Sequence, residues 1–159
     1  MNAISARQTP CIGVCSTGIG DIVCRGCKRF AHEIIDWNRY VPAQRRAVMA
    51  RLQDLLDQVI RPKIVVTDRQ KLLMHIDYQQ IAHGAGQSSL GLVYALLRVG
   101  ANQIEDPNHF GFRVNPPWRQ YSLVSLKQRI DEDFYTLSCA HYERFIQPAP
   151  RVLTRSPSR

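Results

Sequence analysis

Four cysteines within seventeen residues constrain the fold of this chain more than any other feature of its sequence. They are Cys11, Cys15, Cys24 and Cys27, in the pattern C-x3-C-x8-C-x2-C. The same segment holds four of the nine glycines and only a few large apolar side chains. Because so little apolar surface cannot pack a core, the segment needs a cross-link or a bound ion in order to fold.

The spacing of these cysteines predicts that all four bind one metal centre. A tetrahedral site needs four soft donors at about 2.3 Å from the metal, and two close pairs of cysteines on adjacent turns supply them. The second pair encloses Arg25 and Gly26, a turn short enough for backbone amides to point at a thiolate. The first pair has a looser spacing, with three residues between its cysteines.

Both a zinc ion and an iron–sulfur cluster fit this pattern. With four thiolates, either centre carries a charge of about −2, so the neighbouring Arg25, Lys28 and Arg29 suit both. We favour zinc slightly, because closed structural sites are the commoner use of such compact modules. His32 is a less favoured substitute ligand, and Cys139 is expected to be a buried, inert thiol.

The sequence disfavours other uses of the cysteines. No apolar run is long enough to cross a bilayer, and residues 1–10 lack the apolar segment of a secretory signal. We therefore expect a cytoplasmic protein that is not inserted in a membrane. Cytoplasmic thiols stay reduced, which argues against disulfides. A redox-active C-x-x-C pair would need a βαβ setting, which the surrounding sequence does not indicate.

The charge of the chain suggests a partner. The net charge is +8, and such a surplus favours nucleic acid or an acidic protein. Basic residues around the cysteines and the helices that follow form the predicted contact surface: Arg25, Lys28, Arg29, Arg39, Arg45 and Arg46. A solvated face that balances the thiolate charge is the alternative interpretation.

Hydrophobic periodicity predicts a mainly α-helical protein with minor β structure. We expect helices over residues 30–39, 42–60, 88–99 and 122–146, a strand over 63–67, and either structure over 69–76. Residues 101–121 are expected to be rich in loops. Asp131, Glu132 and Asp133 are expected to form a solvated acidic face.

The same pattern divides the chain into four parts. Residues 1–10 form a flexible lead-in, and residues 11–61 form a four-cysteine module with two helices. Residues 62–147 form a mostly helical globular part. Residues 148–159 form a disordered basic tail.

Several short motifs follow one another in the first third of the chain. They are PCIGVC at 10–15, CRGC at 24–27, Glu33-Ile34 with Trp37, and QRR at 44–46. In order and spacing they resemble the bacterial domain-of-unknown-function family numbered 1289, over about residues 9–53. The resemblance implies a four-cysteine centre, and members of the family are often labelled predicted iron–sulfur proteins. It implies no biochemical activity.

The chain departs from the family pattern at two positions. Val41 stands where the family usually has Ser or Thr, and Gln44 stands where it often has Glu. We expect Pro42 to compensate by fixing the first turn of the second helix. Gln44 is expected to weaken a capping box without abolishing it.

No catalytic constellation is evident in the sequence, and a small-molecule substrate is not expected. The leading hypothesis is a non-enzymatic, cytoplasmic metal-binding protein that presents a basic surface to nucleic acid or a protein partner. The alternative is an iron–sulfur protein that transfers electrons or senses oxidants.

Overall fold

The computed structural model describes residues 9–147 and is mainly α-helical, with one small sheet. The α-helices in this range are α1 (Ala31–Ile35), α2 (Pro42–Ile60), α3 (Arg69–Tyr78), α4 (Ser89–Gly100) and α5 (Leu123–Phe145). The strands are β1 (Ile64–Val66) and β2 (Phe112–Val114), and short 3-10 turns span Thr17–Ile19, Pro107–Phe110 and Pro116–Trp118. The prediction of a mainly α fold with minor β structure is therefore confirmed. The predicted tail and residues 1–8 of the predicted lead-in lie outside the described residues.

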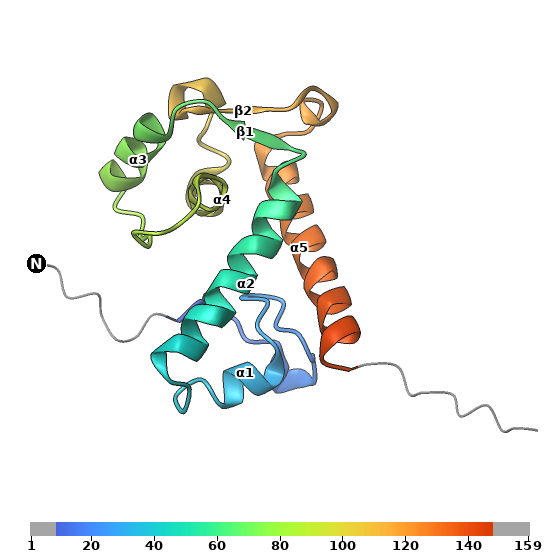
Figure 1. Ribbon diagram of the computed structural model, residues 1–159. Coiled ribbons are helices and arrows are strands. Elements are labelled where there is room, and N and C mark those ends of the chain that lie inside the picture. Colours follow the sequence, from blue (N-terminus) through green and yellow to red (C-terminus); the bar gives the residue numbers. More distant parts are fainter. Residues whose placement is uncertain (1–8, 148–159) are drawn as a thin grey trace, which may run out of the picture.

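The long helices α2 and α5 form the frame of the molecule (Figure 1). Helix α2 has the bounds that its apolar stripe and its flanking prolines predict. Pro42 occupies its first turn, and the Gln44 side chain accepts a 3.0 Å hydrogen bond from the Val41 amide. Helix α5 begins after Ser122, whose hydroxyl accepts a hydrogen bond of 3.1 Å from the Ser125 amide. These capping contacts satisfy amides that have no partner within a helix.

The shorter elements pack at one end of this frame. Strands β1 and β2 pair antiparallel, with Val65 opposite Arg113. Strand β2 is a short element that the prediction of a loop-rich stretch over residues 101–121 did not include. Residues 69–76, for which the sequence left helix and strand open, lie in α3, whose first turn is capped by the Asp68 carboxylate, which accepts from the Lys71 amide at 3.0 Å.

A single hydrophobic core joins residues on both sides of position 61. Its buried members include Leu52, Ile60, Leu72, Leu96 and Ile130, and these lie on α2, α3, α4 and α5. The predicted boundary between the four-cysteine module and the helical part therefore runs through a continuous core. Among residues 9–147, no helix combines the length and apolar character needed to cross a membrane.

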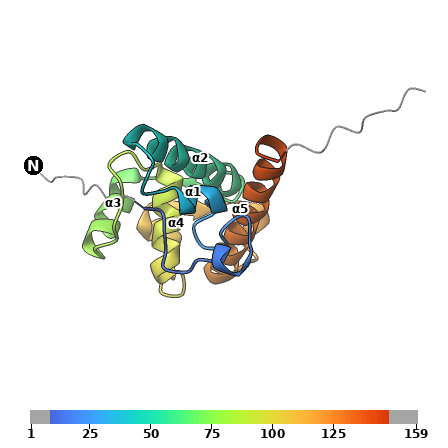
Figure 2. The same cartoon turned by 90° about the horizontal axis from the view of Figure 1, so that it is seen from below.

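The cysteine segment and α1 lie at the other end of the frame, between the separated ends of α2 and α5 (Figures 1 and 2). Helix α1 ends at Ile35, four residues before the predicted end. The chain leaves the helical path at Asp36 and forms a turn in which the Arg39 amide donates to the Asp36 carbonyl at 2.8 Å. The Trp37 ring, in this turn, belongs to the hydrophobic core.

Candidate metal centre

A tight turn holds the second cysteine pair. In this cysteine turn, residues 24–28, the Lys28 amide donates to the Cys24 carbonyl at 2.8 Å, and the Cys24 amide donates to the Arg29 carbonyl at 2.9 Å. Val23 and Phe30 continue the pairing as an antiparallel bridge. The turn closes through a left-handed backbone conformation at Lys28, with φ of +62°. The two thiols are thereby placed next to each other and buried.

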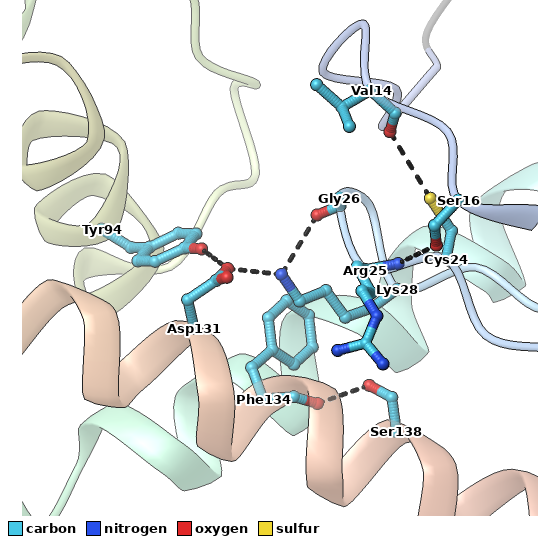
Figure 3. A network of polar contacts seen from close by, with 10 residues as sticks. All are labelled: Val14, Ser16, Cys24, Arg25, Gly26, Lys28, Tyr94, Asp131, Phe134 and Ser138. Carbon is cyan, nitrogen blue, oxygen red and sulfur yellow. Dashed lines mark hydrogen bonds and ion pairs between the residues drawn. The ribbon is translucent and has the colours of Figure 1, made fainter. Parts of the chain in front are cut away.

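The Cys24 sulfur lies among backbone amides. Burial by itself raises the pKa of this thiol, but hydrogen bonds from the backbone of Cys27, Ser16 and Gly26 lower the pKa from 9.0 to about 7. In the thiol form, Sγ of Cys24 donates to the Val14 carbonyl at 3.6 Å (Figure 3). Three amides around one sulfur favour the thiolate, which is the form that binds metals.

The Cys27 sulfur has a cationic neighbour. Burial raises the pKa of Cys27, and the Arg29 guanidinium opposes this rise by donating from Nε to Sγ at 3.3 Å. Arg29 is itself buried and lies over the Trp37 ring, 4.6 Å from its centroid. The arginine after the cysteine turn therefore stabilises negative charge on sulfur, as the sequence suggested.

The first cysteine pair lies on a loop that packs against this turn. A β-carbon added to Gly26 would lie 2.5 Å from the Val14 carbonyl oxygen, so the two backbones are in direct contact. The Ser16 hydroxyl accepts a 2.9 Å hydrogen bond from the Arg25 amide and fixes the same approach (Figure 3). The loop that carries Cys11 and Cys15 thus packs on the turn of the second pair through residues 12, 14 and 16.

The side chains of Cys11 and Cys15 are nevertheless exposed and make local contacts. Sγ of Cys11 accepts a hydrogen bond from the Gly13 amide at 3.4 Å, and Sγ of Cys15 lies 3.0 Å from the Thr17 hydroxyl. Within residues 9–147, no three His, Cys, Asp or Glu side chains converge in a group that could hold a metal ion. The structure therefore brings Cys24 and Cys27 together and leaves the other two sulfurs on the adjoining loop.

The donor chemistry fits a thiolate-bound metal. One pair of thiols is buried, close together and surrounded by amide and guanidinium donors, and the other pair is carried by a loop already in contact with the first. His32 lies exposed on α1, and Cys139 is half-buried on α5, where the Tyr135 hydroxyl hydrogen bonds to it. Cys139 is thus less buried than the sequence suggested.

The six basic residues predicted to form a contact surface divide into two groups. Lys28 and Arg29 are buried, so they are not available to a partner. The other four are at least partly exposed, and they are Arg25, Arg39, Arg45 and Arg46. Arg25 pairs with Asp21 at 3.1 Å and lies over the Tyr135 ring. Arg45 donates hydrogen bonds to the backbone carbonyls of residues 37 and 38.

Two ion pairs near the cysteines were missed by sequence reasoning. Glu33 is buried, accepts a hydrogen bond from the Phe30 amide at 2.9 Å, and pairs with Arg51 of α2. Lys28 pairs with Asp131 of α5. Asp131 keeps a side-chain exposure of 46%, so residues 131–133 remain on the solvated side of α5 while Asp131 also neutralises a buried lysine. The partners are 18 and 103 residues apart, a separation that no local pattern encodes.

These observations define a mainly α-helical protein in which a cysteine-rich module is packed against a helical body. Residues 9–56 match the family described as "Protein of unknown function (DUF1289)". This match spans the cysteines, α1 and most of α2, and it confirms the resemblance seen in the sequence. No curated protein and no solved structure matches the chain significantly.

Proposed function

We propose that this is a non-enzymatic, cytoplasmic metal-binding protein in which Cys11, Cys15, Cys24 and Cys27 hold one zinc ion or iron–sulfur cluster. One observation carries this proposal: the buried Cys24 sulfur is surrounded by backbone amides and lies next to the Cys27 thiol. Amides directed at sulfur stabilise a thiolate and serve no purpose in apolar packing. The surrounding segment is poor in buried apolar side chains, so a bound centre would supply its missing folding energy.

The first pair would complete the donor set by rotating its side chains. Cys11 and Cys15 are exposed, so their χ1 rotation meets little steric resistance. Their present sulfur contacts are one weak amide bond and one hydroxyl contact. A bound centre would cross-link the two loops that now touch at Gly26. Each loop would then stabilise the position of the other.

Two features support a redox role as the second candidate. The exposure of Cys11 and Cys15 would place one edge of a bound iron–sulfur cluster near solvent, within reach of an electron-transfer partner. The donors around Cys24 and Cys27 would help to set its reduction potential, because hydrogen bonds to the sulfurs tune such clusters. A zinc ion in the same site would have only a structural effect.

The exposed part of the basic surface supports a polyanionic partner. The chain carries a net charge of +8, and Arg39 and Arg46 are exposed at the turn before α2 and in its first turns. A partner such as nucleic acid or an acidic protein would meet this side of the module. Binding to random RNA or duplex DNA should weaken steeply with salt and should weaken further when Arg39 and Arg46 are replaced by Ala.

Anaerobic purification followed by metal analysis and visible absorption tests the metal proposal. One zinc per colourless chain supports a structural site, and stoichiometric iron and sulfide with visible absorption support the redox candidate. The Cys24→Ser variant should lose the bound metal, whereas the matched control Cys139→Ser should keep it. A wild-type protein that carries and binds neither zinc nor iron would refute the proposed function.

A further inference from the structure

Lys28 is 1% exposed, although it carries an ammonium group. Its Nζ pairs with Asp131 of α5 and donates a 3.1 Å hydrogen bond to the carbonyl of Gly26. Asp131 in turn accepts a 2.8 Å hydrogen bond from the hydroxyl of Tyr94 on α4. One ammonium group thus joins the cysteine turn to two helices of the body (Figure 3).

The backbone at Lys28 makes the identity of this residue informative. Its φ of +62° lies in the left-handed region, where glycine is the least strained residue. A lysine at this position is unfavourable for the backbone and requires a buried charge to be neutralised. The contacts of the side chain therefore account for a lysine at position 28, whereas the backbone geometry of the turn would favour glycine.

We propose that Lys28 is a positioning residue for the metal centre, linking the geometry of the cysteine turn to the docking of α5. This inference rests on the proposed function. The ammonium group fixes the Gly26 carbonyl, and the backbone of Gly26 and Cys27 also supplies hydrogen bonds to the Cys24 sulfur. Because such coupling is reciprocal, metal binding and the docking of α5 on the module stabilise each other.

The chain contains a matched control for this contact. Lys63 is also buried, donates to the Val59 carbonyl at 2.9 Å, and pairs with Asp133 of α5 at 2.8 Å. Its Nζ lies 4.8 Å from the centroid of the Trp118 ring, as Nζ of Lys28 lies 5.3 Å from an aromatic ring of α5. The two lysines have the same chemistry, but only Lys28 touches the cysteine turn.

The test compares Asp131→Asn with Asp133→Asn in the full chain. Zinc affinity is measured by competition with a chromophoric chelator, and hydrogen exchange is measured at the amides of residues 24–28. Asp131→Asn should lower zinc affinity by about tenfold, as loss of a group that orients metal ligands does. Asp133→Asn should leave zinc affinity unchanged, even if both variants unfold at lower temperature. Equal zinc affinity in wild type and Asp131→Asn would overturn the proposal.

The exchange measurement separates this inference from the proposed function. If the wild-type chain binds neither zinc nor iron, the proposed function fails. Hydrogen exchange at residues 24–28 then decides by itself whether Lys28 positions the cysteine turn. Faster exchange at residues 24–28 in Asp131→Asn but not in Asp133→Asn would support positioning by Lys28. Unchanged exchange there, or an equal increase in both variants, would overturn it.

Discussion

Gly26 lies directly against the carbonyl oxygen of Val14. A β-carbon on residue 26 would come within 2.5 Å of that oxygen and within 3.1 Å of the Ile12 side chain. Real β-carbons do not approach a backbone oxygen so closely, so one of the two loops would have to move. This contact joins the loop of the first cysteine pair to the turn of the second, and its geometry leaves room only for glycine.

Replacing Gly26 with Ala should therefore separate the two cysteine loops. We expect the variant to lose about 1–3 kcal/mol of unfolding free energy, the usual cost of overpacking a tight contact. Chemical denaturation of the metal-loaded protein measures this loss. Gly18→Ala is the matched control, because a β-carbon there meets nothing within 4 Å. Equal stability of the two variants would contradict the role given to this contact.

Breaking the Glu33–Arg51 pair should destabilise the module strongly. The Glu33→Gln variant leaves the guanidinium of Arg51 without its carboxylate, in a site where Nε of Arg51 already has no hydrogen-bond partner. Loss of one partner from a buried pair costs about 3–5 kcal/mol. Asp36→Asn removes the exposed pair with Arg39 and should change the unfolding free energy little. Thermal and urea unfolding followed by circular dichroism compare the two.

Metal binding should change the reactivity of the first cysteine pair most. Without metal, the exposed thiols of Cys11 and Cys15 should react quickly with an alkylating reagent, and the buried Cys24 and Cys27 should react slowly. With the centre loaded, all four should be protected, whereas Cys139 should react as before. Mass spectrometry of the alkylated peptides reads each site. Persistent fast labelling of the first pair would show that only the second pair binds the metal.

Ionisation of Tyr94 should make stability fall at alkaline pH. Burial, followed by the neighbouring Asp131 carboxylate, raises the pKa of Tyr94 far above its usual value of 10.0. Because the unfolded chain loses this proton at lower pH than the folded chain, the stabilising contribution is present below pH 10 and is lost above it. Tyr94→Phe should lessen the fall in unfolding free energy between pH 9 and about 11. Tyr78→Phe, at an exposed site, should not.

The parts of this protein that could be predicted are those encoded by short stretches of chain. Proline at both ends and an apolar stripe between them determine the bounds of α2. Ser88 caps α4 through the Gly91 amide, as a serine before an apolar run predicts. Strand β2 was missed because three residues are too few to show a period, and its pairing partner β1 lies almost fifty residues earlier.

The candidate site shows the same division. The sequence by itself determined that four thiols and their basic neighbours fall within a segment too poor in apolar residues to pack a core, because composition and spacing are local properties. The tertiary structure alone decided that Lys28 and Arg29 are buried, that the half-exposed Asp131 pairs with Lys28, and that Cys24 lies among amides. Burial and ion pairing depend on which distant segments the core brings together, and one residue's neighbours in sequence do not carry that information.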